Sequence, residues 1–224
     1  MDNMKLFFNK IPRGVIYHKV LESVRYVLTS IFSALNDQSA IKKFESKFAE
    51  YCGREYCVAF PFARTAIYFT LKNLNLPSGS EVILPPVTIK GIVDVVLALD
   101  LVPVYVDWDF DTLNFQLDDL HRKASPKTKA VIITTLFGLV PDMKVLVDFF
   151  RDNGIFIIED FSQCLNGSFD GKRVGTFGDV GIYSCSSIKT LDTLGGGLAV
   201  TSDAALHEAL RKSQAGLFPV TRRN

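Results

Sequence analysis

Short apolar runs alternate with helical stretches along most of this chain, and this alternation limits the folds open to it. The apolar runs are Tyr56–Phe60, Glu81–Leu84, Val104–Val106, Ala130–Thr135, Ile155–Ile158, Val180–Cys185 and Leu198–Thr201. Helical patterns lie between most of them, and a last one covers about Ala204 to Ser213. Continuous apolar strands separated by helices predict a mostly parallel sheet covered on both faces. We therefore expect a three-layer α/β/α domain.

Two more helical patterns precede this alternation. Apolar residues recur at helical spacing from Val20 to Ile31 and again from Ile41 to Tyr51. Gly53 is a plausible stop for the second helix. The pattern predicts an N-terminal helical segment over residues 1–52, a large domain over 53–213, and a tail over 214–224.

Charge and hydropathy exclude some partners. The 224 residues include 25 basic and 24 acidic side chains, for a net charge of +1, so we expect no nucleic-acid surface. No apolar stretch reaches the roughly 20 residues that a membrane span needs. The N-terminus shows no apolar signal core, so a cytoplasmic location is expected.

In a parallel sheet the ligand lies beyond the carboxyl ends of the strands, and this rule selects the candidate site residues. They are Arg64, Thr65, Thr88, Glu159, Asp160, Gln163, Ser184, Ser186, Ser187 and Lys189. The three histidines fall in helical or surface segments, which gives little support to Ser-His-Asp chemistry or a histidine metal site.

Lys189 and Asp160 point to one chemistry when they are taken together. A lysine in an apolar-rich loop can be an amine nucleophile, but alone it is more often a solvated loop residue. A lone aspartate after a strand is more often a cap or turn former. Pyridoxal phosphate (PLP) enzymes, however, need both a Schiff-base lysine and a carboxylate on the pyridine nitrogen.

Four consecutive motifs carry a family resemblance. They are Ile157-Ile-Glu-Asp-Phe-Ser-Gln163, Gly171-Lys-Arg-Val-Gly-Thr-Phe-Gly-Asp179, Tyr183-Ser-Cys-Ser-Ser-Ile-Lys189 and Gly195-Gly-Gly-Leu-Ala-Val-Thr201. The chain resembles the sugar aminotransferases of the DegT/DnrJ/StrS group from about residue 15 to 212. These are PLP enzymes with the aspartate-aminotransferase fold (fold type I).

The resemblance implies roles for individual residues. Lys189 matches the Schiff-base lysine, and Asp160 matches the carboxylate that pairs with the protonated pyridine nitrogen. Gln163 matches a residue near the phenolic oxygen of PLP, and Ser184 matches a hydroxyl that holds the phosphate. The turn containing Ala63, Arg64 and Thr65 matches the phosphate-binding turn at a helix start.

The chain departs from the family pattern in three places. Phe62-Ala63-Arg64 stands where Ser-Gly-Thr is usual, and Arg64 can hold a phosphate by charge and fork geometry. Ile89 stands where an aromatic side chain usually stacks on the pyridine ring. The small C-terminal domain of complete members is absent from these 224 residues.

The resemblance implies an aminotransferase that moves an amino group, expected from glutamate, to a nucleotide-linked keto sugar for glycan synthesis. It implies a homodimer in the complete form. The short chain leaves open a non-catalytic remnant or one half of a two-chain enzyme, with a separate chain supplying the C-terminal domain. A dinucleotide-binding Rossmann domain is disfavoured because the turn Pro61-Phe-Ala-Arg-Thr65 contains no glycine.

Overall fold

The computed structural model describes residues 20–32, 38–109, 112 and 114–217, and a seven-stranded sheet runs through its centre. The strands are β1 (Tyr56–Phe60), β2 (Glu81–Leu84), β3 (Val102–Tyr105), β4 (Thr128–Thr134), β5 (Phe156–Asp160), β8 (Val180–Ser184) and β9 (Gly197–Thr201). Their order is β1-β9-β8-β5-β4-β2-β3. Only β9 within this sheet of described residues is antiparallel to its neighbours, so the mostly parallel sheet is confirmed.

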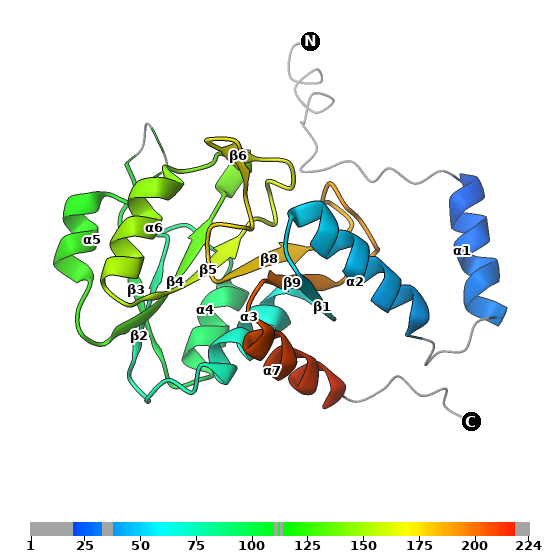
Figure 1. The fold of residues 1–224 in the computed structure, drawn as a ribbon, viewed down its shortest axis with the longest axis horizontal. Helices are drawn as coiled ribbons and strands as arrows, with labels where there is room; N and C mark the ends of the chain where they lie inside the picture. The colour runs from blue at the N-terminus through cyan, green and yellow to red at the C-terminus, as the bar shows by residue number, and fades with distance from the viewer. Residues whose placement is uncertain (1–19, 33–37, 110–111, 113, 218–224) are drawn as a thin grey trace, which may run out of the picture.

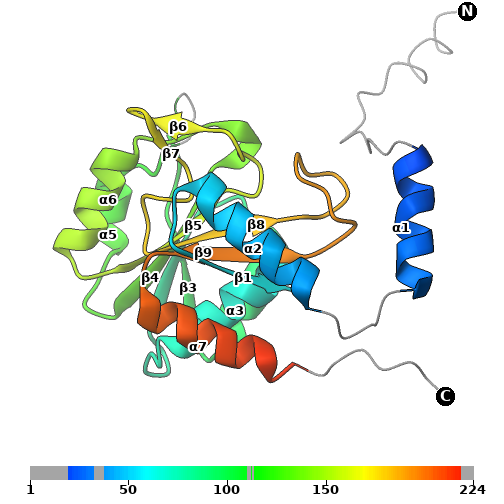
Figure 2. The same cartoon turned by 45° about the vertical axis from the view of Figure 1, so that its right-hand side comes forward.

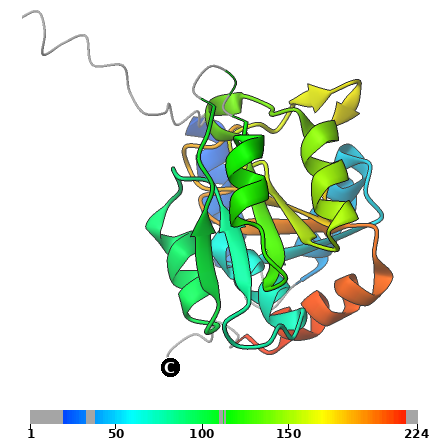
Figure 3. The same cartoon turned by 90° about the vertical axis from the view of Figure 1, so that its left-hand side faces the viewer.

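Helices cover both faces of the sheet, as Figures 1 and 3 show. The helices are α1 (Val20–Phe32), α2 (Ser39–Cys52), α3 (Ala63–Asn73), α4 (Lys90–Leu97), α5 (Leu117–Lys123), α6 (Met143–Asp152) and α7 (Ala204–Ala215), with a 3-10 turn at Leu136–Gly138. Helices α3, α4 and α7 lie on one face, and α2, α5 and α6 lie on the other. The predicted three-layer α/β/α architecture is therefore confirmed.

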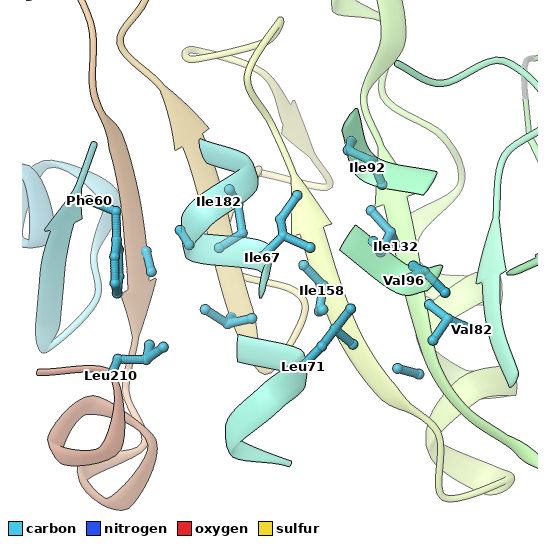
Figure 4. Close-up of a cluster of buried hydrophobic side chains, with 14 of the residues drawn as sticks. Phe60, Ile67, Leu71, Val82, Ile92, Val96, Ile132, Ile158, Ile182 and Leu210 are labelled. Carbon is cyan, nitrogen blue, oxygen red and sulfur yellow. The ribbon is translucent and has the colours of Figure 1, made fainter. Parts of the chain in front are cut away.

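The alternation of side chains along each strand divides the core between the two faces. Ile158 and Ile182 belong to the cluster under α3, α4 and α7, which Figure 4 shows. Ile157 belongs to the cluster under α5 and α6, and Tyr183 to the cluster under α2. Successive strand residues point to opposite faces, so this division also fixes which way the polar residues at the strand ends point.

Helix α2 is tied to β1 and to α7 through the buried Glu45 carboxylate. The Glu45 carboxylate accepts hydrogen bonds from Arg211 of α7 at 2.8 and 2.9 Å and from the Ala59 N–H at 2.7 Å. Gly53 ends the helix in the left-handed conformation at φ 72°, as its stop signal predicts. Helix α1, in contrast, stands apart from the sheet in Figures 1 and 2, with its apolar side chains exposed.

A short hairpin lies outside the main sheet. The short hairpin β6 (Ser168–Phe169) and β7 (Lys172–Arg173) follows β5, and the sequence pattern did not predict it. No helix among the described residues is both long and apolar enough to cross a membrane. Residues 218–224 of the expected tail, and residues 1–19, lie outside the described part of the chain.

Candidate active site

Strands β1, β8, β5, β4 and β2 point the same way, so their carboxyl ends meet at one edge of the sheet. Asp160 ends β5, Ser184 ends β8, and the Ala63–Thr65 turn opens α3 just after β1. Ile89 immediately precedes α4, after β2. The predicted site residues thus come from separate segments to a single edge. Their individual roles stay predictions.

Asp160 is buried at the end of β5, with 8% of its surface exposed. Its Oδ1 accepts a hydrogen bond from the Ser162 N–H at 3.1 Å. Burial raises the pKa of Asp160, and the bond from Ser162 and the positive charge of Lys189 oppose that rise. The positive charge of Lys189 thus offsets part of the cost of burying the Asp160 carboxylate.

Glu159 has a different environment although it precedes Asp160 in the same strand. Its carboxylate accepts hydrogen bonds from the backbone N–H groups of Gly175, Phe177 and Gly178, the last two at 2.9 and 3.3 Å. Burial raises the pKa of Glu159, while those three bonds and the charge of Arg54 lower it. Its acceptor capacity is therefore used to hold the 175–178 loop.

The first turn of α3 packs closely against β9. Phe62 forms a bridge with Gly196, and a Cβ added to Gly197 would lie 2.2 Å from the Ala63 nitrogen. Ser184 pairs with Gly197 in the β8–β9 register, which places its strand end beside this turn. Among the described residues no side chain caps the N-terminus of α3. The turn therefore offers backbone N–H groups and a helix N-terminus, the usual surroundings of a bound phosphate.

Ser184 and Asp160 point to the same face of the sheet. Each follows by two positions a residue of the cluster under α3, namely Ile182 and Ile158. Tyr183 and Glu159 alternate with them and point to the opposite face. The hydroxyl, the carboxylate and the start of α3 therefore converge on one side of the sheet edge.

Arg64 lies at the outer side of this turn. Its guanidinium carbon is 4.3 Å from the centre of the Phe62 ring, a cation–π contact. Together with Thr65 and Lys90 it lines an open groove of about 680 Å³ between α3 and α4. Ile89, 58% exposed, stands at the start of α4.

Gln163 fixes an unusual piece of backbone. Its Oε1 accepts a hydrogen bond from the Phe137 N–H at 3.1 Å. Phe137 has φ 55°, which a residue with a side chain rarely adopts, and its ring is 74% exposed. Gln163 thus joins the segment after β5 to the turn after β4, at the same edge as Asp160.

Two structural features were not predicted from the sequence: the hydrogen bond from the Leu191 N–H to the Tyr183 hydroxyl, and the positive φ of Phe137. Tyr183 stood out only as a hydroxyl-bearing residue inside an otherwise apolar strand, a pattern that also fits a simple core aromatic. Phe137 carried no local signal, because a positive φ is expected of glycine, asparagine or aspartate rather than of phenylalanine.

A family model, the DegT/DnrJ/EryC1/StrS aminotransferase family, matches residues 16–218. The chain belongs to this family. It is 34% identical over 168 residues to GDP-perosamine synthase of Escherichia coli O157:H7, covering 75% of this chain and 46% of that protein. It is 32% identical over 197 residues to L-glutamine:2-deoxy-scyllo-inosose aminotransferase of Streptomyces kanamyceticus, covering 88% of this chain and 46% of that one.

A solved structure of the same fold is a putative sugar aminotransferase from Streptococcus pneumoniae in its PLP form. The TM-score is 0.81 at 24% identity, covering 90% of this chain and 57% of that one, and the likeness shows a shared fold. The DegT/DnrJ/EryC1/StrS chain described here spans about half the length of the curated relatives it matches.

Proposed function

We propose that this chain is the cofactor-binding part of a PLP-dependent sugar aminotransferase. The observation that carries the proposal is Asp160, buried at the carboxyl edge of the sheet within electrostatic reach of Lys189. The residues present fit PLP, because they supply an amine for its aldehyde, a carboxylate for its ring nitrogen and a helix N-terminus for its phosphate. Bound PLP supplies an electron sink for the substrate carbon that loses its proton.

Each residue has a separate task in this proposal. The Nζ of Lys189 would hold the cofactor at its aldehyde carbon and, as a free amine, would accept the proton from the donor's α-carbon. The carboxylate of Asp160 holds the proton on the ring nitrogen. Ser184 and the turn of Ala63, Arg64 and Thr65 would bind the phosphate, and Gln163 would contact the phenolic oxygen.

The proposed acceptor is a nucleotide-linked keto sugar. Support comes from the family and from relatives named for sugar or cyclitol amination, such as GDP-perosamine synthase. We propose glutamate as the amino donor, and because one relative is named for L-glutamine, both amino acids need to be compared.

PLP titration of the purified chain tests the first step. We expect wild type to bind PLP in a complex that borohydride reduces to a modified Lys189, detected by peptide mass mapping. Lys189→Ala should lose this modification, while Lys144→Ala, an exposed lysine paired with Asp148, should keep it. A wild-type chain that takes up no PLP at saturating concentration would refute the proposal.

A multiple-turnover assay addresses the remnant and two-chain alternatives. Amino transfer from glutamate or glutamine to a keto sugar nucleotide is measured with the chain alone and with any separately encoded chain of the C-terminal type. Turnover by the chain alone would reject the remnant. Turnover only in the mixture would identify a two-chain enzyme.

We also propose that the chain acts as a homodimer in the cytoplasm. Large apolar side chains are exposed at the edge that holds the site: Phe62 is 49% exposed, Ile89 58%, Phe137 74% and Leu194 73%. Such exposed apolar groups are typical of surfaces that a partner chain covers. Sedimentation equilibrium should give twice the monomer mass, and a monomer at all accessible concentrations would contradict the proposal.

A further inference from the structure

The loop that carries Lys189 is long and leaves the sheet. Residues 185–196 join β8 to β9 and project beyond the strand ends in Figure 2. Backbone bonds close the base of this loop: the Cys185 N–H donates to the Gly196 oxygen at 3.0 Å, and the Thr193 N–H donates to the Cys185 oxygen at 3.1 Å. These bonds fix where the loop starts and ends. They do not by themselves fix its middle, where Lys189 lies.

Tyr183 reaches that middle from the strand below. Its hydroxyl accepts a hydrogen bond from the Leu191 N–H at 3.0 Å, two residues after Lys189. The tyrosine is 1% exposed, and its ring centre lies 5.6 Å from that of Phe48 and 5.3 Å from that of Phe161. A ring held between two others has little freedom, so its hydroxyl is a fixed anchor for the loop.

The same aromatic cluster is connected to Asp160. Phe161 follows Asp160 directly, and its N–H donates to the Ile182 oxygen at 3.1 Å. The ring that supports Tyr183 is therefore attached to the residue after the buried carboxylate. One rigid group thus touches both the end of β5 and the loop of Lys189.

We propose that Tyr183 is a positioning residue that sets the place of Lys189 relative to Asp160. The inference rests on the proposed function, since it takes Lys189 and Asp160 as the two residues that act on the PLP ring. Tyr183 acts through the backbone of Leu191, from the face of the sheet opposite Asp160. Burial raises the pKa of Tyr183, which keeps the hydroxyl neutral at physiological pH.

Tyr183→Phe is the sharpest test because phenylalanine keeps the ring and removes only the hydroxyl. Tyr56→Phe is the matched control: Tyr56 pairs with Thr201 at the far end of β1 and stacks on His207. Hydrogen exchange of the Leu191 amide is measured without cofactor, alongside the melting temperature. Loss of one hydrogen bond should speed this exchange by about three- to tenfold in Tyr183→Phe and leave Tyr56→Phe at the wild-type rate. An unchanged Leu191 rate would overturn the proposal.

The second measurement asks whether the anchor matters for Lys189. Saturating PLP is added to each variant, and the rate of Lys189 modification under borohydride is followed by peptide mapping. We expect a slower rate in Tyr183→Phe and the wild-type rate in Tyr56→Phe. Faster Leu191 exchange with an unchanged Lys189 rate would reject the positioning role. If wild type takes up no PLP, the proposed function fails, and the exchange result still decides whether Tyr183 anchors the loop.

Discussion

Glu159 and Asp160 are neighbours in β5, yet their carboxylates lie on opposite faces of the sheet. Glu159 accepts three backbone hydrogen bonds from the 175–178 loop, whereas Asp160 faces the start of α3 and the charge of Lys189. The two acids therefore divide two tasks between them. Glu159 holds a loop of the fold, and Asp160 is the proposed partner of the cofactor ring.

The first prediction compares the two amide variants at these positions. Glu159→Gln keeps the shape but turns one of two accepting oxygens into an NH2 group that faces backbone N–H donors, so we expect a loss of about 1–3 kcal/mol in the free energy of unfolding. Asp160→Asn should not lose stability at neutral pH but should weaken PLP binding by about ten- to a hundredfold, the worth of a charge-assisted hydrogen bond. Urea unfolding and PLP titration check both. Equal destabilisation by the two variants would contradict the division.

The second prediction concerns pH and Asp160. Burial raises its pKa in the folded chain above the ordinary 3.8, so the folded state holds the proton more tightly than the unfolded state. The contribution of Asp160 to the free energy of unfolding is therefore fully present below pH 3.8. It is lost as the pH rises through the pKa of the folded state. Without PLP, Asp160→Asn should therefore unfold at higher urea than wild type at pH 7, and the difference should vanish near pH 3. If wild type is more stable than Asp160→Asn at pH 7, the prediction is wrong.

The third prediction tests the contact between Gly197 and the α3 turn. A Cβ at residue 197 would lie 2.2 Å from the Ala63 nitrogen and 2.3 Å from the Phe62 carbonyl carbon, so backbone must move. Gly197→Ala should cost about 1–3 kcal/mol in the free energy of unfolding. It should also weaken PLP binding more than pyridoxal binding, because the displaced turn is the predicted phosphate site. Gly216→Ala, whose Cβ would meet its nearest atom at 3.4 Å, is the control and should change neither value much.

Most strands and helices of the fold could be predicted from local patterns of apolar residues. Strands such as Ile155–Ile158 are apolar throughout because both faces of a parallel sheet are covered. The direction of β9 could not be predicted in this way, since it depends on the path of the 185–196 loop. The β6–β7 hairpin was also missed, because two-residue strands carry too little alternation to detect.

The candidate site was proposed from residues whose types together suggest one chemistry, and their roles stay predictions. Lys189 and Asp160 were selected as candidates because they follow apolar strands at the expected edge. The anchoring by Tyr183 was not predictable, because its partner is a backbone N–H eight residues away that no sequence pattern reveals. The strained Phe137 was likewise hidden, since its backbone is held by Gln163 from another segment.

The fourth prediction follows from that strain. Phe137→Gly removes a side chain that is 74% exposed and relieves a positive φ, so little burial is lost. We expect the free energy of unfolding to rise by up to about 1 kcal/mol. Leu139→Gly removes a similarly exposed apolar side chain (52% exposed) at φ −83°, and it should destabilise instead. Destabilisation by Phe137→Gly as large as that by Leu139→Gly would argue against strain at Phe137.

The last prediction decides what Arg64 contributes. Its guanidinium now stacks on Phe62 beside the α3–α4 groove, and a phosphate at the α3 turn would offer a stronger, charge-assisted partner. If Arg64 binds that phosphate, Arg64→Gln should weaken PLP binding by about tenfold or more and leave pyridoxal, which lacks the phosphate, unaffected. The loss of PLP affinity caused by Arg64→Gln should become smaller as the salt concentration rises, because screening weakens the contact between Arg64 and phosphate in wild type. Equal weakening for both ligands would mean that Arg64 supports the groove through Phe62, leaving phosphate recognition to the backbone of the turn.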